Sequence, residues 1–295
     1  MSRSNLSSAL GFGGSAIAGV HRPVSEEDAA AAVEEAWRLG VRRFDTAPFY
    51  GAGLGERRLG AALAGRPRDE FALSTKVGRL VVEDGFERDY SRDGVLRSLE
   101  ASRARTDIDR FDLVLVHDPE DHVAPALDEA LPALFQLRDE GAIGAVGVGI
   151  NLVEPLQEIL ARTDLDAVML ANRWTLLDRT GLPVLEDCAA RGIAVLAAAP
   201  FNSGILAEPE PRDDATFGYR PAPPELLARA RAYAAACAAY GVELPAAALR
   251  FPLRHPAVAA VVAGLGDAAE VRAAHARLQA PIPAELWVEL DALGA

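Results

Sequence analysis

Residues 42–51, RRFDTAPFYG, place an apolar strand pattern directly before Asp45 and put Tyr50 on the loop that follows. Residues 71–78, FALSTKVG, repeat this arrangement, because a second apolar run leads directly to Lys76. In both stretches a polar residue stands just past the carboxyl end of a predicted strand.

A third stretch of this kind, FDLVLVHDP at residues 111–119, ends its apolar run at His117. Polar groups from three strands can meet only if the strands lie side by side and end on the same side. A parallel α/β barrel has this property, and its active-site groups lie at the carboxyl ends of the strands. We therefore expect these residues to lie together at one end of such a barrel.

The remaining sequence alternates short apolar runs with amphipathic helical segments. Eight runs have strand character: 10–18, 41–44, 71–75, 113–116, 143–149, 167–170, 193–198 and 258–263. The first helix is expected between Ser25, which forms a capping-box pattern with Asp28, and Gly40. Further helices are expected at 54–63, 91–105, 124–140, 153–160, 181–191, 224–240 and 268–278. This order predicts an α/β fold, a (β/α)8 TIM barrel forming a single domain over residues 1–295.

Three segments depart from a minimal barrel. Residues 245–254 and 283–290 have the pattern of supplementary C-terminal helices, and residues 201–223 form a long connection of the kind that is usually a functional lid or partly disordered. An open doubly wound sheet is the alternative fold, but residues 9–19, ALGFGGSAIAG, lack the GxGxxG spacing of its dinucleotide site.

Composition limits the class of partner. The 295-residue chain is 50% hydrophobic and 25% charged, with a formal net charge of −13. Nucleic acids and anionic membranes attract cationic surfaces, so a small-molecule substrate is expected instead. No apolar run approaches the ~18 residues of a membrane span, and the N-terminus lacks a signal-peptide pattern, so we expect a cytoplasmic protein. Cys188 and Cys237 are expected to be free, reduced and buried, and no metal-ligand spacing occurs.

The four polar residues suggest proton chemistry. A free tyrosine has a pKa near ~10, which makes it a poor acid or base at neutral pH. An ammonium group from Lys76 lowers that pKa, while Asp45 keeps the lysine charged and oriented. His117 can supply a second hydrogen bond to a substrate oxygen. The set predicts a tuned proton donor in Tyr50.

Here the chain resembles the aldo-keto reductase superfamily over residues 10–278. The segments FDTAPFYGAGLGERRLG (44–60), FALSTKVGR (71–79) and LVLVHDP (113–119) look like its three signature segments. Within the superfamily the chain is most similar to the branch of D-threo-aldose, L-fucose, L-galactose and pyridoxal dehydrogenases. The resemblance implies a catalytic tetrad of Asp45, Tyr50, Lys76 and His117. It further implies hydride transfer between a nicotinamide and a C–O centre, with Tyr50 exchanging the proton and no metal.

The resemblance also implies contacts to NAD or NADP, at the carboxamide, the nicotinamide ring, the pyrophosphate and the adenosine ribose. Asn151 matches the family position that holds the carboxamide, Arg173 stands at a common glutamine position, and Trp174 is a candidate ring to pack on the nicotinamide. The remaining candidates are Phe201, Asn202, Ser203 and Gly204 after the seventh strand, and Gly264, Gly266, Asp267, Glu270 and Arg272 after the eighth.

The ribose segment bears on cofactor choice. Carboxylates at Asp267 and Glu270 would repel the 2′-phosphate of NADP, which favours NAD, unless Arg272 turns inward to compensate. Trp174 and Phe49 are candidates for walls of the substrate pocket. His122 is a further candidate there, although a solvated loop histidine is the more ordinary interpretation.

The leading interpretation is therefore a nicotinamide-dependent oxidoreductase for a sugar-like or small carbonyl compound, either an aldose 1-dehydrogenase or an aldehyde or ketone reductase. One alternative is a non-catalytic nicotinamide-binding sensor or partner subunit. Another is a lyase or aldolase that forms a Schiff base on Lys76, because strand-end lysines in barrels also perform amine catalysis. The substrate, the direction of the reaction and the oligomeric state stay open.

Overall fold

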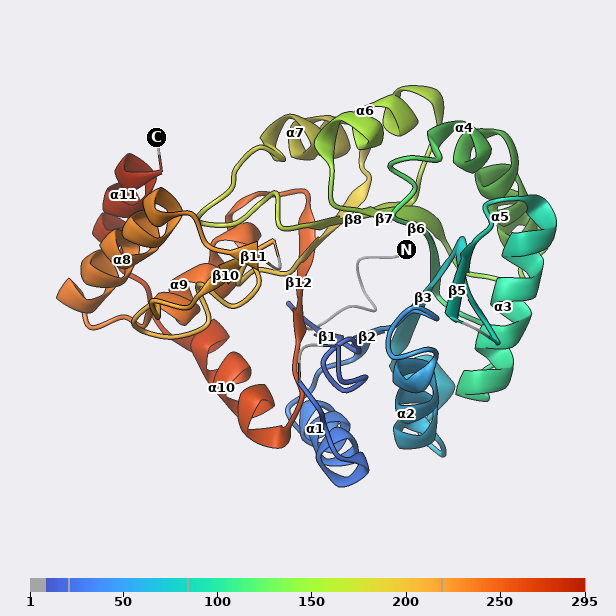
Figure 1. The fold of residues 1–295 in the computed structure, drawn as a ribbon, viewed down its shortest axis with the longest axis horizontal. Helices are drawn as coiled ribbons and strands as arrows, with labels where there is room; N and C mark the ends of the chain where they lie inside the picture. Colours follow the sequence, from blue (N-terminus) through green and yellow to red (C-terminus); the bar gives the residue numbers. More distant parts are fainter. Residues whose placement is uncertain (1–8, 21, 84, 219, 295) are drawn as a thin grey trace.

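A closed barrel of parallel strands forms the centre of the computed structural model, which describes residues 9–20, 22–83, 85–218 and 220–294 (Figure 1). Its strands are β1 Leu10–Gly13, β2 Arg43–Asp45, β3 Ala72–Val77, β6 Leu113–His117, β7 Val146–Ile150, β8 Ala167–Ala171, β9 Ala194–Ala198 and β12 Val258–Gly264. They pair in the ring order β1, β12, β9, β8, β7, β6, β3, β2. The predicted (β/α)8 barrel is confirmed.

Helices surround the ring on its outside (Figure 1). They are α1 Glu26–Arg38, α2 Leu54–Leu63, α3 Arg92–Thr106, α4 Val123–Pro125, α5 Leu131–Asp139, α6 Val153–Arg162, α7 Leu182–Arg191, α8 Pro224–Ala239, α9 Leu244–Arg250, α10 Ala268–Gln279 and α11 Ala284–Leu293. Both expected supplementary helices are present, because α9 with the 3-10 turn Pro252–Arg254 covers the first segment and α11, packed against α8, covers the second.

Helix α1 begins and ends as its sequence predicts. The Ser25 hydroxyl accepts a hydrogen bond from the Asp28 N–H at 3.0 Å, which satisfies one of the free donors of the first turn. Gly40 follows the last turn with φ at 84°, a left-handed conformation that glycine adopts without a steric cost.

Two strands differ from their predicted bounds in a way that matters for the site. Strand β1 ends at Gly13 rather than at residue 18, because after a last bond from the Gly14 N–H to the Asp45 carbonyl the chain turns, and the Ala18 N–H donates to the Gly14 carbonyl. Strand β3 continues to Val77, so Lys76 lies inside the strand and not after it. Strand β3 pairs with β2 on one side and β6 on the other, and the Lys76 side chain extends from it to Asp45 at the end of β2.

The predicted helix at 124–140 is interrupted. Helix α4 passes into a wider π turn, Ala126–Ala130, before α5 begins. Pro132 has no backbone N–H and so cannot donate to the carbonyl four residues earlier, and the Leu131 N–H instead bonds to Ala126 O.

Two short hairpins lie in segments that the sequence predicts as loops. Strands β4 Arg79–Val82 and β5 Gly85–Arg88 form an antiparallel pair directly after β3, and therefore lie near the carboxyl ends of the barrel strands. Strands β10 Thr216–Phe217 and β11 Arg220–Pro221 form a smaller pair within the long connection after β9.

The core has two layers. Side chains that alternate along the strands fill the interior of the barrel: Leu113, Leu115, Ala145, Ala167, Met169, Leu196, Ala260 and Val262. The opposite faces of the strands pack against the helices, where the rings of Phe12 and Phe44 lie 5.9 Å apart.

Cys188 and Cys237 are free and buried, as expected, and burial raises the pKa of both thiols to about 11. Within the described part of the chain, no single helix has the length and apolar character to cross a membrane, although a bent pair, α8 with Leu244–Arg254, passes by length and composition. The first eight residues, to which the signal-peptide expectation refers, lie outside the described residues.

Candidate active site

The expected tetrad comes from three strands that are adjacent in the ring. Asp45 ends β2, Lys76 lies in β3, and His117 ends β6. Parallel pairing sets Asp45 beside Ser74 and Lys76 beside Leu115, so the carboxyl ends of these strands lie together. All three polar side chains are buried.

Lys76 and Asp45 form a buried ion pair. Lys76 Nζ lies 2.6 Å from Asp45 Oδ2 and 2.8 Å from the Thr46 carbonyl oxygen, and Ser74 Oγ donates to Asp45 Oδ1 at 2.7 Å. Lys76 is 2% exposed and Asp45 3% exposed. Burial alone would lower the pKa of the lysine, but the Asp45 carboxylate outweighs it and raises that pKa. Lys76 is therefore a fixed cation.

Tyr50 lies above this pair on the loop between β2 and α2. The Lys76 ammonium lies 4.8 Å from the centre of the tyrosine ring, and the His117 ring centre lies 6.0 Å away. Burial raises the pKa of Tyr50, and the Lys76 charge opposes this without reversing it. The expected lowering of the Tyr50 pKa is therefore wrong for this state of the protein. Removing a phenolate from water is unfavourable, and the attraction of the Lys76 ammonium, which Asp45 partly neutralises, does not fully offset it.

His117 is a neutral imidazole in this environment. Burial, followed by the charges of Lys76 and Arg79, holds its pKa well below the ordinary value. Its Nδ1 is buried without a hydrogen-bond partner, which favours the tautomer with the proton on Nε2. The Tyr90 hydroxyl fixes the backbone by donating to the His117 carbonyl at 2.7 Å. His117 can therefore donate one hydrogen bond into the site.

Phe49 stands beside the tetrad, as expected for a pocket wall. Its ring centre is 6.2 Å from that of His117 and 4.6 Å from that of Phe86, which is 46% exposed on the hairpin of β4 and β5. The sequence did not identify Phe86, because nothing in a loop pattern shows that a hairpin will fold back over the site.

Asn151 belongs to a polar network beside His117. Its side-chain amide donates to Asp118 Oδ1 at 3.1 Å and accepts from Asn172 at 3.2 Å. Arg173 donates to the Asn151 carbonyl at 2.7 Å and pairs with Asp178 at 2.8 Å. Asn172 and Asp118 were not among the expected site residues, although both directly follow a strand at this end of the barrel.

Trp174 occupies a different place from the expected one. Its ring is 9% exposed, donates to the Pro252 carbonyl at 3.2 Å, and packs 5.1 Å from Phe251 and 5.8 Å from His255. These contacts lie in the packed layer that includes the turn after α9. The geometry makes Trp174 a core residue, and we do not retain it as a nicotinamide or substrate contact.

The segment after β9 has an unusual backbone. Asn202, Ser203 and Gly204 have successive φ values of 45°, 60° and 98°, all left-handed. Asn202 is buried, and its Oδ1 has no hydrogen-bond partner. Phe201 is partly buried and Gly204 exposed. The Asn202 N–H donates to the Ala199 carbonyl at 3.1 Å and the Gly204 N–H to the Phe201 carbonyl at 3.0 Å, so these two groups hold the turn itself.

The start of α10 carries a reciprocal cap. The Asp267 side chain accepts from the Glu270 N–H at 2.9 Å, and Glu270 accepts from the Gly266 N–H at 2.7 Å. Arg22, which the sequence did not single out, pairs with both carboxylates, at 2.7 Å and 2.9 Å. Arg272 turns to Glu35 on α1, 3.6 Å away, and so does not compensate these acids.

The other histidine candidate lies outside the tetrad. The His122 ring packs 5.1 Å from that of Tyr90, and its buried Nδ1 has no partner. It is thus not a freely solvated loop residue, and its ring packs on Tyr90 rather than on a residue of the tetrad. The Arg58 side chain, which is 10% exposed, pairs with Glu26 at 2.8 Å.

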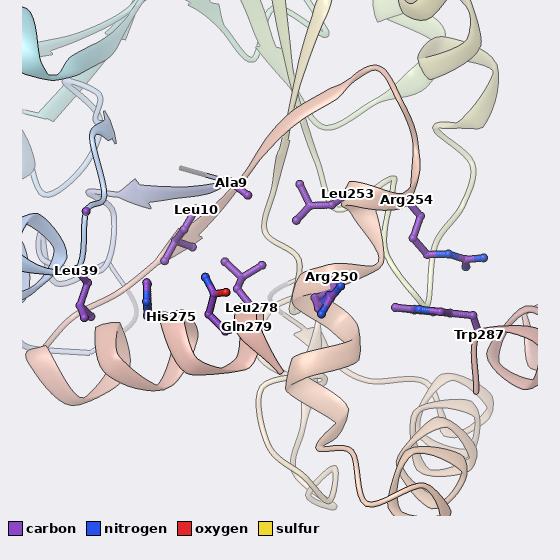
Figure 2. A pocket seen from close by; sticks show the side chains of 11 residues that line it. Ala9, Leu10, Leu39, Arg250, Leu253, Arg254, His275, Leu278, Gln279 and Trp287 are labelled. Atoms are coloured by element: carbon purple, nitrogen blue, oxygen red, sulfur yellow. The ribbon is translucent and has the colours of Figure 1, made fainter. Parts of the chain in front are cut away.

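A hollow of about 530 Å³ lies at the opposite end of the barrel (Figure 2). It is lined by the start of β1, the end of α10 and the turn before β12, among other segments. Its two arginines are already engaged, Arg254 with Asp291 and Arg250 with the Ala280 carbonyl. We assign it no part in the chemistry.

Comparison with known proteins gives one family. The model of the aldo/keto reductase family matches residues 9–295. The chain is 40% identical to D-threo-aldose 1-dehydrogenase from a Pseudomonas species, over 96% of this chain and 92% of the relative. It is 35% identical to pyridoxal 4-dehydrogenase from Microbacterium luteolum, over 97% and 94%, and 32% identical to L-galactose dehydrogenase from Arabidopsis thaliana, over 90% and 82%.

Solved structures agree on the fold. An aldo-keto reductase from Bacillus halodurans in its holo form is 26% identical with a TM-score of 0.80, over 97% of this chain and 93% of that one. A glycerol dehydrogenase from Gluconobacter oxydans has a TM-score of 0.83 at 22% identity, over 99% and 95%, and supports the fold alone.

Proposed function

The chain belongs to the aldo/keto reductase family, and from this premise we propose that it is an aldose 1-dehydrogenase in which Tyr50 exchanges the substrate proton. Family membership and the dehydrogenase relatives make it a nicotinamide-dependent oxidoreductase that acts on a small molecule. The observation that carries the proposal for Tyr50 is its position over the buried pair of Lys76 and Asp45 and beside a neutral His117.

Each of the four tetrad residues has a separate role in the proposed reaction. The Tyr50 hydroxyl and His117 Nε2 hold the reacting oxygen from two sides, and two fixed donors stabilise the charge that develops on it. Tyr50 takes the proton when an alcohol is oxidised and returns it when a carbonyl is reduced. Lys76 stabilises the Tyr50 phenolate that accepts this proton in oxidation and that is left after the proton is given up in reduction, and Asp45 with Ser74 holds Lys76 in place.

The chain offers groups that fit a dinucleotide. The exposed Gly204 and the partly buried Ser203 leave the segment after β9 open to the pyrophosphate, and the buried Asn202 Oδ1 without a partner fits a ligand group that donates to it. The side-chain amide of Asn151 fits a carboxamide. A bound oxidised nicotinamide would supply the hydride acceptor for the C1 hydrogen, and Tyr50, as the phenolate, would accept the C1 hydroxyl proton, so that a cyclic aldose would become a lactone.

We favour NAD as the cofactor. Asp267 and Glu270 share the single cation Arg22, so the group of three carries a net negative charge where the adenosine ribose is expected. A 2′-phosphate would meet this charge and would also compete with the carboxylates for Arg22. Arg272, which could have offset them, pairs with Glu35 instead.

The substrate class rests on the relatives together with the site. The most similar relatives reported above are named for sugar and pyridoxal dehydrogenation. The exposed ring of Phe86 and the adjoining Phe49 provide an apolar wall beside His117 against which a sugar ring can lie. We therefore propose a cyclic aldose oxidised at C1.

The two alternative functions fit the site less well. A Schiff-base enzyme needs a neutral lysine, whereas Lys76 is held charged by Asp45 and donates to Thr46. A cofactor-binding sensor without catalysis has no use for a complete set of four catalytic groups. The geometry therefore counts against both.

The test is a panel of aldoses, pyridoxal and simple carbonyls with NAD and NADP, followed by the near-ultraviolet absorbance of the reduced cofactor. We expect turnover of an aldose with NAD. Tyr50→Phe should lower kcat by a factor on the order of 10²–10⁴ while the cofactor Kd stays unchanged. Tight cofactor binding without turnover of any compound would instead support the sensor.

A further inference from the structure

Asp118 follows His117 and is held in a strained conformation. Its φ of 45° is left-handed, a conformation that residues other than glycine adopt infrequently and at a cost in free energy. The surrounding structure imposes it: the Asp118 N–H donates to the Gly149 carbonyl at 2.8 Å, and the Tyr90 hydroxyl shares its one hydrogen between the carbonyls of His117, at 2.7 Å, and Asp118, at 2.9 Å. The backbone thus aims the carboxylate at a chosen set of partners.

Both oxygens of this carboxylate are in use. Oδ1 accepts from the Asn151 amide at 3.1 Å, and Oδ2 accepts from Arg79 Nη1 at 2.7 Å. His117 Nε2 lies 3.6 Å from Oδ2, just beyond hydrogen-bond distance. Asp118 therefore stands between the expected substrate-orienting residue and the expected carboxamide-binding residue, and Arg79 occupies the oxygen that His117 could reach.

Arg79 is itself fixed. It begins the hairpin of β4 and β5, and its guanidinium lies 3.6 Å from the centre of the Phe49 ring. Stacking on one face leaves the N–H groups in the plane free to bond Asp118. The side chain is 17% exposed, so the pair with Asp118 is partly shielded from water.

We propose that Arg79 is a positioning residue that holds the Asp118 carboxylate on Asn151 and away from His117, which keeps the imidazole N–H available for the substrate oxygen. This inference rests on the proposed function. It concerns residues outside the tetrad and explains why a hairpin that contributes no tetrad residue folds beside the site.

The charges around His117 agree with this assignment. From β3 it faces Lys76, which is paired with Asp45, and from β4 it faces Arg79; both cations lower its pKa. Tyr50 and Tyr90 face it as neutral phenols, because burial raises the pKa of each. Burial and then Glu120 raise the pKa of Asp118, and Arg79 and Lys76 oppose this. Without Arg79, an anion faces His117 with one cation fewer.

The experiment is a double-mutant cycle on Arg79→Gln and Asp118→Asn. Asparagine tolerates the left-handed backbone and still accepts from Asn151, so Asp118→Asn removes the charge and little else. In Arg79→Gln the freed carboxylate takes the His117 N–H. We expect kcat/KM for the aldose to fall by a factor on the order of 10², the loss typical of one missing transition-state donor. The pKa of His117 should rise into the observable range in an NMR titration.

The double variant should recover most of kcat/KM and return the His117 titration to its wild-type form, because no anion is left to capture the imidazole. Arg79→Lys, which keeps a cation but loses the planar stack, should show a smaller defect. Arg88→Gln is the matched control, since it removes an exposed arginine of the same hairpin whose partner Asp121 lies 3.5 Å away; it should behave as wild type.

A double variant that is as impaired as Arg79→Gln, or more so, would overturn the proposal and make Arg79 a structural residue. If Arg79→Gln alone does not fold, the proposal is tested by comparing kcat/KM of Asp118→Asn with that of the double variant. The two values should be similar, because Arg79 should be dispensable once residue 118 is neutral. A large difference in kcat/KM between those two overturns the proposal. The His117 titration needs no substrate, so it decides the role of Arg79 even if no aldose is turned over and the proposed function fails.

Discussion

Aspartate–cation pairs lie at both ends of this barrel, but they differ in burial and in whether they bond the strand backbone. At the amino ends of the strands, Asp112 and Asp166 each directly precede a strand and accept the N–H of a neighbouring strand, Leu73 at 2.8 Å and Val146 at 2.8 Å. Each also pairs with a partly exposed arginine of a preceding segment: Arg68 at 2.6 Å and Arg138 at 3.0 Å.

At the carboxyl ends, the pair of Asp45 and Lys76 is almost completely buried and satisfies no strand backbone N–H. Backbone strain is distributed in the same way. Of the seven described non-glycine residues with left-handed φ, Asp107 ends a helix, and the others follow strands at the carboxyl end: Ala52, Asp118, Asn172, Ala199, Asn202 and Ser203.

The difference shows how one scaffold separates stability from chemistry. The amino end uses charge to complete strand pairing in contact with water, where an ion pair contributes little and its loss is tolerated. At the carboxyl end, buried charges and left-handed backbone conformations lower stability, but they hold functional groups in defined positions. Substitutions at the amino end should therefore change stability without changing turnover, whereas substitutions at the carboxyl end should change turnover as well.

The largest effect should come from Lys76→Met. It removes the cation next to Tyr50, so kcat should fall by a factor on the order of 10³, and it leaves the Asp45 carboxylate buried without a cation, which should lower the free energy of unfolding by ~3–5 kcal/mol. Asp45→Asn/Lys76→Met should recover much of the stability and none of the activity. Urea unfolding and initial rates measure the two separately. A double variant with substantial activity would break the comparison.

The second prediction concerns the pKa of Tyr50. Burial raises its pKa, so in the protein without cofactor the phenol should stay protonated beyond the ordinary value of ~10. The difference between ultraviolet titrations of the wild type and Tyr50→Phe isolates this group. An ionisation below about pH 9 would show that Lys76 outweighs burial, contrary to the balance inferred here.

Asp112→Ala should lower the free energy of unfolding by ~1–3 kcal/mol, because the Leu73 N–H loses its acceptor and Arg68 its partner. Its kcat/KM should match the wild type. Asp166→Ala is the corresponding change before β8, two strands along the ring from β6, and should behave alike. A loss of turnover without a loss of stability in either variant would mean that the amino end also serves the reaction.

The smallest effect is expected from Asp267→Ser. Serine keeps the helix cap but removes one carboxylate from Arg22, so the ratio of kcat/KM with NADP to that with NAD should rise several-fold, or about 1 kcal/mol. The Asp267 carboxylate lies at the carboxyl end, where it both caps α10 and faces the expected ribose. An unchanged ratio would place the cofactor discrimination elsewhere.

The sequence predicted the residues that share the site better than it predicted their electrostatics. Asp45, Lys76 and His117 could be found because each stands at the carboxyl end of an apolar run, and parallel strands bring such positions together. The direction of the Tyr50 pKa shift could not be predicted, because it depends on how much water the loop excludes. Trp174 was misassigned for a related reason: its position after a strand is compatible with facing either the site or the core.

The cofactor and hairpin contacts show the same limit. Arg22 pairs with Asp267 and Glu270 across 245 and 248 positions of sequence, and no local pattern marks such a pair. Arg79 and Phe86 lie in a segment without strand periodicity long enough to indicate a hairpin.

By itself, the sequence determined the barrel, the end at which its polar groups gather and the identity of those groups, because strand periodicity and helix caps are local properties of the chain. Only the tertiary structure decided that Lys76 is a fixed cation, that His117 is neutral and that Asp118 is held from it by Arg79. Those properties depend on desolvation and on distances between residues far apart in sequence, which exist only once the ring of strands has closed.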